Sequence, residues 1–243
     1  MKDTILFGDC RETLKQFDEK ARCCVTSPPY YGLRNYGSED CQIGLEESPE
    51  EYIQKLVEVF REVRKNLTDD GTLWLNIGDS YYNYRPGKGQ ALNKQSVSKT
   101  KQDLPDKCAR RGNKLDGLKE KDLIGIPWML AFALRADGWY LRQDIIWSKG
   151  NPMPESVRDR CTKSHEYIFL LSKSQNYYFD VDTIKEQSRR KRSVWNVNTK
   201  PNKQSHFATY PPELITPCIL AGSEENDIVL DPFMGSGTTA MVA

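Results

Sequence analysis

The sequence lacks the features that mark metal-binding, disulfide-linked, secreted or membrane-spanning proteins. Its seven cysteines are an odd number and include no C-x-x-C pair, which argues against disulfides and against a zinc site. No apolar run approaches the roughly 20 residues that a membrane span needs, and residues 1–3 lead directly into an apolar run without a signal peptide. We therefore expect a soluble, cytoplasmic protein in a reducing compartment, with no metal and no membrane partner.

The chain also has almost no net charge, at +1 over 243 residues, but that charge is unevenly distributed. Residues 85–121 carry +7 and residues 185–203 carry +6, which leaves −12 for the remainder. Two basic blocks on an otherwise acidic chain indicate contact with a polyanion, with a solvated charged face as the alternative. Residues 81–121 interleave tyrosines with lysines and lack apolar periodicity, so we expect a basic insertion loop that grips nucleic acid.

Length and periodicity predict a single α/β domain over residues 1–243. Alternating helices and strands along the chain predict a mostly parallel sheet. Cys218 lies in one of the expected helices and is interpreted as a core residue. The expected strands are 4–7, 23–26, 72–77, 139–147, 167–171 and 228–231, and the expected helices are 11–17, 48–67, 122–137 and 213–220.

The segment Thr-Ser-Pro-Pro-Tyr at 26–30 follows a short apolar run at 23–25 that predicts a buried strand. The segment is therefore expected at the carboxyl end of a strand, where open α/β sheets bind ligands. Pro28 and Pro29 stiffen the turn and leave its carbonyls free to accept hydrogen bonds, and Ser27 adds a hydroxyl.

Two acceptors held by such a stiff turn can grip the two hydrogens of an exocyclic amine and aim its nitrogen at an electrophile. Tyr30 and Tyr31 offer flat faces on which a base could stack. A tight surface turn with an aromatic plug is the alternative interpretation of the same residues.

A second strand-to-turn junction lies near the end of the chain, where the apolar run at 228–230 leads into the glycine-rich segment 231–239. Strand, glycine-rich turn and helix are the layout of a nucleotide-type site, and Gly235 and Gly237 let the backbone approach a ligand closely. No lysine follows the second glycine, so the segment is not a P-loop. Asp231 favours a cationic ligand, which fits S-adenosylmethionine, and glycines that serve only packing are the alternative.

In this order, the two segments resemble the DNA amino-methyltransferases of the arrangement called the β group. Between them, residues 205–214 resemble the family's segment that wraps the cofactor, and residues 7–10 resemble its adenine-contacting acid. The resemblance covers nearly the whole chain. It implies a Rossmann-like, S-adenosylmethionine-dependent methyltransferase fold with inserted DNA-recognition loops, acting on double-stranded DNA.

The resemblance also implies roles for individual residues. The catalytic turn would consist of Ser27, Pro28, Pro29 and Tyr30. The cofactor would contact Asp9, Cys10, Thr26, His206, Phe207, Ala208, Asp231, Phe233, Gly235, Ser236, Gly237 and Thr238. DNA would contact Tyr31, Arg34, Lys149, Asn151, Arg189, Arg190 and Arg192, the last three within a candidate target-recognition region at 173–204.

The first residue of the catalytic turn bears on the target base. Family members with Ser at this position lean towards N4 of cytosine and those with Asp lean towards N6 of adenine, so Ser27 favours cytosine N4, with adenine N6 as the alternative. The expected mechanism is direct displacement, in which the amine of a flipped base attacks the sulfonium methyl group without a covalent enzyme intermediate.

Other interpretations stay open. The chain ends at Ala243, shortly after the cofactor loop, whereas the family continues with a further strand and a ribose-gripping acid, so we expect a C-terminally incomplete domain. A catalytically inactive DNA-binding remnant is then an alternative, and a complementing C-terminal fragment, a homodimer partner or a cognate restriction endonuclease are candidate partners. Pro-Pro-Tyr methyltransferases of protein glutamine or RNA usually place the cofactor loop first, the reverse of this chain.

Overall fold

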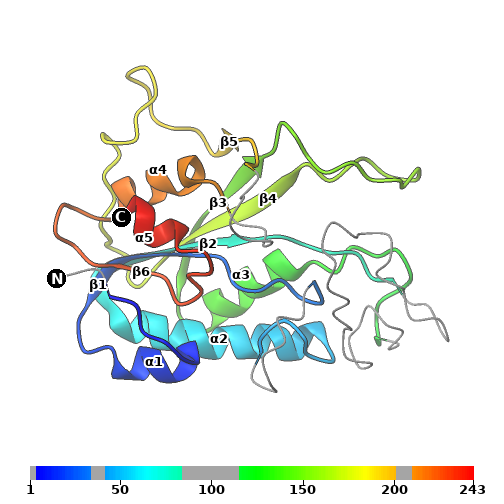
Figure 1. Cartoon of the computed structure of the whole chain (residues 1–243), viewed down its shortest axis with the longest axis horizontal. Coiled ribbons are helices and arrows are strands. Elements are labelled where there is room, and N and C mark those ends of the chain that lie inside the picture. Colours follow the sequence, from blue (N-terminus) through cyan, green and yellow to red (C-terminus); the bar gives the residue numbers. More distant parts are fainter. Residues whose placement is uncertain (1–3, 34–41, 84–114, 201–209) are drawn as a thin grey trace.

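The structure is a computed structural model that describes residues 4–33, 42–83, 115–200 and 210–243. In these residues, six strands form one sheet in the order β5-β3-β4-β2-β1-β6, flanked by helices on both faces (Figure 1). The strands are β1 (Ala21–Thr26), β2 (Leu67–Ile77), β3 (Tyr140–Ser148), β4 (His165–Ser172), β5 (Val194–Asn196) and β6 (Val229–Leu230). The helices are α1 (Cys10–Gln16), α2 (Pro49–Asn66), α3 (Ile126–Ala136), α4 (Pro212–Gly222) and α5 (Thr238–Val242).

The predicted α/β fold is confirmed, and the sheet is mixed. Strand β1 runs parallel to β2 and β6, and β3 runs parallel to β5, whereas β4 is antiparallel to both β2 and β3. The connection between β3 and β4 at 149–164 contains no helix. Because parallel neighbours need a crossover connection, this direct return makes the two strands antiparallel.

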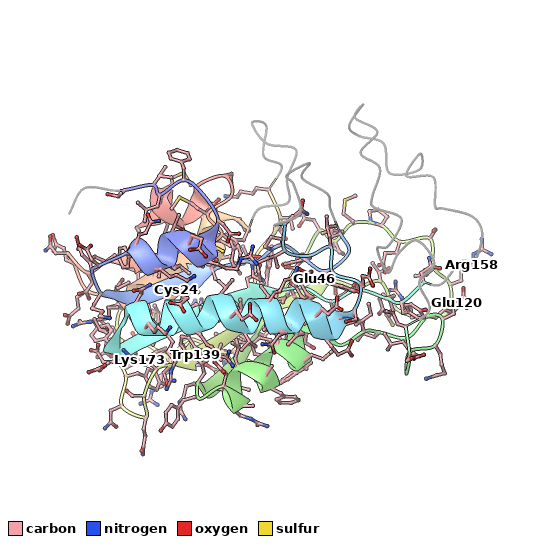
Figure 2. The ribbon with its side chains drawn as sticks, turned by 90° about the horizontal axis from the view of Figure 1, so that it is seen from below. Cys24, Glu46, Glu120, Trp139, Arg158 and Lys173 are labelled. Carbon is pink, nitrogen blue, oxygen red and sulfur yellow. The ribbon has the colours of Figure 1, made fainter. Side chains whose placement is uncertain are left out.

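Alternating side chains send the sheet's apolar residues into two cores. Leu73 and Leu75 of β2 face the core under α1, α2 and α3, whereas Trp74 between them faces the core that α4 covers. Figure 2 looks onto the face where α1, α2 and α3 lie side by side. Burying a large apolar side chain such as Phe60 of α2, which is fully buried, contributes roughly 1.5–3 kcal/mol.

Helix α2 begins as its sequence predicts. Pro49 occupies the first turn, and the Ser48 hydroxyl accepts a hydrogen bond from the Glu51 amide at 3.2 Å. The Glu51 carboxylate accepts from the amide of Glu47 at 3.2 Å, one residue before the Ser48 amide that a capping box uses. Side chains of Ser48 and Glu51 therefore both accept hydrogen bonds from backbone amides at the helix start.

Several expectations need correction. Residues 4–7 form no strand, and Phe7 is 91% exposed, because no described strand pairs with them. The helix expected from 122 begins at Ile126, since Gly125 holds a left-handed conformation with φ 88° just before it. Strand β6 lies beside β1, at the edge of the described sheet.

The expectation for Cys218 is met, and that for the basic loop lies mostly outside the described residues. Cys218 is fully buried in α4, as predicted. Most of the basic loop at 81–121 lies outside the described residues, which resume at Leu115. In the described part of the chain, no helix combines the length and apolar character needed to cross a membrane, and no cluster of His, Cys, Asp and Glu could hold a metal ion.

Candidate active site

The two segments that the sequence singles out lie together at one edge of the sheet. Strands β1 and β6 are parallel neighbours, with Cys24 opposite Leu230, so the turns that follow them leave the sheet on the same side. Thr26, the last residue of β1, is fully buried, and its hydroxyl donates to Asp231 Oδ1 at 2.6 Å. This hydrogen bond joins residues that are 205 positions apart in the sequence.

Asp231 is the centre of this junction. Its carboxylate also accepts from the Phe233 amide at 2.9 Å, the Thr239 hydroxyl at 2.5 Å and the Tyr210 hydroxyl at 3.2 Å. Burial raises the pKa of Asp231, against the lowering effect of the hydrogen bonds from Thr239, Thr26, Phe233 and Tyr210. Asp231 and Thr26 were both predicted to contact the cofactor. In the structure, their hydrogen bonds hold the start of the glycine-rich loop in place.

The glycine-rich loop has free space around the two glycines whose φ values are positive. Gly235 and Gly237 have φ values of 55° and 82°, in the left-handed region that favours glycine. A Cβ at Gly237 would meet no atom within 4 Å, and one at Gly235 would only reach the Phe233 carbonyl at 3.8 Å. Close packing therefore does not explain these glycines, and the loop leaves room for a ligand to approach the backbone.

The ends of the loop are tied to the fold. The Phe233 ring packs edge-to-face against Phe60 of α2, with ring centroids 6.4 Å apart. Thr238 opens α5, and its hydroxyl lies 3.4 Å from that of the exposed Ser236. Phe233 thus anchors the loop, while Ser236 and Thr238 present polar groups at its surface.

The other residues predicted to contact the cofactor are either not linked to the glycine loop by a hydrogen bond or lie outside the described residues. Asp9 caps α1, and Arg11, which hydrogen-bonds and pairs with it, holds the pKa of Asp9 below its ordinary value. Burial, and then the charge of Asp9, raise the pKa of the Cys10 thiol to about 11. Within the described residues, no hydrogen bond links either side chain to the 231–239 loop. His206, Phe207 and Ala208 lie outside the described residues.

The proline turn is held from helix α2. Tyr52 is fully buried, and its hydroxyl donates to the Pro29 carbonyl at 2.9 Å. No described residue donates to the Pro28 carbonyl, which leaves it available as an acceptor. Tyr31, predicted to stack on DNA, is instead a core residue that is 3% exposed, because its ring packs against Tyr52 with centroids 5.5 Å apart.

Tyr30 lies beside a small pocket at the end of β2. Its hydroxyl donates to Glu166 Oε2 at 2.6 Å and lies 3.3 Å from Asn76 Oδ1. Burial, and then the neighbouring charge of Glu166, raise the pKa of Tyr30 well above its ordinary value, so the hydroxyl stays protonated. The pocket is lined by Tyr30, Tyr31, Leu33, Gly78, Asp79, Ser80 and Ile126.

Asp79 forms one wall of this pocket and caps helix α3. Its carboxylate accepts from the amides of Ser80, Gly125 and Ile126 at 2.9–3.1 Å, an arrangement that the positive end of the helix dipole stabilises. Lys163 donates to the Asp79 backbone carbonyl at 2.8 Å, and burial lowers the pKa of this lysine. The pocket therefore has one fixed polar wall.

The predicted DNA contacts are distributed unevenly. Lys149 pairs with Glu166 at 2.5 Å and lies 4.2 Å from the centre of the Trp147 ring. The side chain of Asn151 exchanges hydrogen bonds with the backbone of Thr199 at 2.9 and 3.0 Å. Neither side chain is directed at the pocket by a hydrogen bond in the described residues. Arg189, Arg190 and Arg192 are exposed, and Arg34 lies outside the described residues.

Sequence reasoning missed three residues that hold the turn, namely Tyr52, Asn76 and Glu166. Tyr52 lies on the apolar face of α2, and a tyrosine on such a face needs a hydrogen-bond partner when it is buried. That signal could have identified Tyr52. Asn76 and Glu166 reach Tyr30 from two further strands, and no local pattern in the sequence marks them.

A family model described as DNA methylase, N6_N4_Mtase, matches residues 21–243. The Type II methyltransferase M.Cfr9I of Citrobacter freundii is 51% identical over 98% of this chain and 79% of its own length. The Type II methyltransferase M.SmaI of Serratia marcescens is 51% identical over 98% of this chain and 81% of its own length. Both relatives thus align with almost the whole chain.

Solved structures show the same fold. The PvuII DNA methyltransferase, named as cytosine-N4-specific, superposes with a TM-score of 0.68 at 19% identity, covering 97% of this chain and 75% of that one. A protein of Thermus thermophilus named as a putative DNA modification methylase, solved in complex with S-adenosyl-L-methionine, superposes with a TM-score of 0.60 at 26% identity. That match covers 97% of this chain and 82% of the other.

Proposed function

Since this chain belongs to the N6_N4_Mtase family of DNA methylases, we propose that it methylates the exocyclic amine of a flipped DNA base, with N4 of cytosine as the favoured target. The methyl donor is S-adenosyl-L-methionine. The observation that supports the proposal most is the 2.6 Å hydrogen bond between Thr26 and Asp231, which holds the proline turn beside the glycine loop. An amine held at one turn then lies next to a methyl donor held at the other.

The glycine loop fits a cationic nucleoside. The backbone is open at Gly235 and Gly237, and Asp231 supplies negative charge close to it. Phe233, Ser236 and Thr238 would complete the binding surface, together with the predicted segment at 206–208. When bound, S-adenosyl-L-methionine supplies the methyl group as a sulfonium electrophile.

The proline turn fits an exocyclic amine. The Ser27 hydroxyl and the Pro28 carbonyl would accept the two amine hydrogens and direct the nitrogen lone pair towards the methyl group. Tyr30 would stack on the flipped base, whose extrusion from the duplex costs a few kcal/mol. The raised pKa of Tyr30 keeps its ring neutral, so it serves as a stacking surface and not as a base. Catalysis would rest on positioning and electrostatics.

Double-stranded DNA is the substrate, and the exposed Arg189, Arg190 and Arg192 are candidate contacts to its bases or phosphates. Action on cellular DNA would place the protein in the cytoplasm. The Type II names of its relatives suggest a cognate restriction endonuclease as a functional partner. Light scattering with and without DNA would distinguish a monomer from a homodimer.

Nucleoside mass spectrometry tests the proposal. DNA is incubated with this protein and S-adenosyl-L-methionine carrying a deuterated methyl group, and is then digested to nucleosides. Labelled N4-methylcytosine is the expected product. Labelled N6-methyladenine would retain amine methylation and overturn the Ser27-based choice of target. A parallel reaction with the Tyr30→Ala protein serves as the unlabelled reference. Wild-type reactions that leave the DNA equally unlabelled would contradict the proposed function.

A further inference from the structure

Glu166, near the start of β4, reaches the candidate active site although no motif includes it. Its side chain is only 15% exposed. One carboxylate oxygen accepts from the Tyr30 hydroxyl at 2.6 Å and from the Asn76 amide at 3.4 Å. The other oxygen lies 2.5 Å from the Lys149 ammonium group.

The direction of these hydrogen bonds is fixed by chemistry. An ionised carboxylate only accepts, so the tyrosine hydroxyl must donate. Donor–acceptor distances of 2.5–2.7 Å are usual for a hydroxyl donating to a carboxylate, and such bonds are roughly twice as strong as neutral ones. Glu166 therefore selects one orientation of the Tyr30 hydroxyl and, through it, of the ring.

Gly78 lies against one edge of the Tyr30 ring, close to the hydroxyl end and to Glu166. A Cβ at position 78 would lie 2.7 Å from Tyr30 Cε2 and 3.4 Å from Glu166 Cδ, so any larger residue would displace the ring or the carboxylate. The same three residues meet where β2 ends beside β4. The ring is thus confined between backbone on one side and a fixed carboxylate at its hydroxyl.

Lys149 is held as firmly as its partner. Its ammonium group pairs with Glu166 and lies 4.2 Å from the centre of the Trp147 ring, a cation–π distance. Its side chain is only 18% exposed. Lys149 therefore acts on the site through the carboxylate, although the sequence suggested a direct contact with the target base.

We propose that Glu166 is a positioning residue that orients Tyr30 for stacking on the target base, with Lys149 and Asn76 holding its carboxylate in place. The inference rests on the proposed function for the role of the Tyr30 ring. It adds a residue of β4 to a site whose proline turn and glycine loop follow β1 and β6.

A double-mutant cycle tests the inference. Tyr30→Phe removes the hydroxyl and keeps the ring, and Glu166→Ala removes the carboxylate. Each single change is expected to slow single-turnover methyl transfer by about tenfold through misplacement of the base. If Glu166 acts through the hydroxyl, the double variant is no slower than either single variant. Multiplied effects, of about a hundredfold, would overturn the inference.

Two further readouts separate positioning from a structural role. The loss should appear in kcat, with the KM for DNA nearly unchanged, because Tyr30 acts on a base that is already bound. Glu166→Gln keeps an acceptor for the hydroxyl and should recover most of the rate. A loss confined to KM, or a Gln variant as slow as the Ala variant, would contradict positioning.

Controls distinguish this inference from the proposed function. Glu62→Gln removes an acid–lysine pair of α2 with Lys65, away from Tyr30, and should leave the rate unchanged. If the wild-type protein transfers no methyl group, the proposed function fails. The same cycle is then measured on the equilibrium constant for unfolding, where coupling of about threefold or more supports the Glu166–Tyr30 contact and strict independence overturns it.

Discussion

The two turns of the candidate active site are held in place by different means. The glycine loop takes its shape from its own φ values and from Asp231 at its start, which gathers hydrogen bonds from Thr26, Phe233, Thr239 and Tyr210. The proline turn is held from outside, by a tyrosine of α2 and a glutamate of β4. A loop that is organised around a carboxylate of its own can be identified from sequence, whereas the supports of the second turn cannot.

The largest expected effect comes from removing the stacking surface of the proline turn. Tyr30→Ala deletes the ring and should slow methyl transfer by at least about a hundredfold, since misplacement of a reacting group can cost that much. Single-turnover rates measure the effect, and circular dichroism should show the fold retained. A fully active Tyr30→Ala protein would refute the assignment of the base pocket.

Removing the Asp231 carboxylate, which accepts hydrogen bonds at the start of the glycine loop, should affect stability as well as activity. Asp231→Leu leaves the buried hydroxyl of Thr26 without its acceptor, at a cost of about 1–3 kcal/mol for an unsatisfied group. Urea unfolding measures the loss of stability. Thr26→Ser, which keeps the hydroxyl donor, is the matched control. An Asp231→Leu protein of wild-type stability would show that the hydrogen bonds to Asp231 do not stabilise the fold.

Weakening the support of the proline turn by α2 should affect methyl transfer without affecting the glycine loop. Tyr52→Phe removes the hydrogen bond to the Pro29 carbonyl and should lower the free energy of unfolding by about 1 kcal/mol. Methyl transfer should slow while the affinity for S-adenosyl-L-methionine stays unchanged. Tyr140→Phe alters an exposed tyrosine of β3 and serves as control. Weaker cofactor binding in Tyr52→Phe would contradict the separation.

The smallest effect is expected at Asp9. Because Arg11 lowers the pKa of Asp9 below its ordinary value of 3.8, ionised Asp9 stabilises the folded protein above that pH, and this contribution is lost as the pH falls through the lowered value. Asp9→Asn still caps α1, so it should cost only a few tenths of a kcal/mol at neutral pH. The difference from wild type, measured by unfolding, should vanish in acid. A loss of cofactor affinity instead would support the role that the resemblance implies.

Much of the fold follows from local patterns in the sequence. The expected helix at 48–67 corresponds to α2, and the expected strands at 23–26 and 72–77 correspond to β1 and β2. The direction of β4 could not be predicted, because it depends on how residues 149–164 return the chain. The expected strand at 4–7 failed for a related reason, since a strand needs a partner that its own sequence does not reveal.

In the candidate site, too, local patterns predicted some residues, whereas others depend on tertiary contacts. Residues 26–30 and 231–239 carry unusual residue types at strand ends, and the structure brings them together. Glu166 and Tyr52 look ordinary in the sequence, and only tertiary packing gives them a partner in the proline turn. Tyr31 misled the sequence interpretation because its position in the motif did not reveal that its ring enters the core.

The most direct test of the account measures S-adenosyl-L-methionine binding by calorimetry in the wild-type, Tyr30→Ala and Asp231→Asn proteins. If the glycine loop binds the cofactor and the proline turn holds the amine, Tyr30→Ala binds the cofactor like wild type although its methyl transfer is at least about a hundredfold slower, and Asp231→Asn loses affinity. Equal losses in both variants, or full affinity in Asp231→Asn, would contradict this division of labour between the two turns.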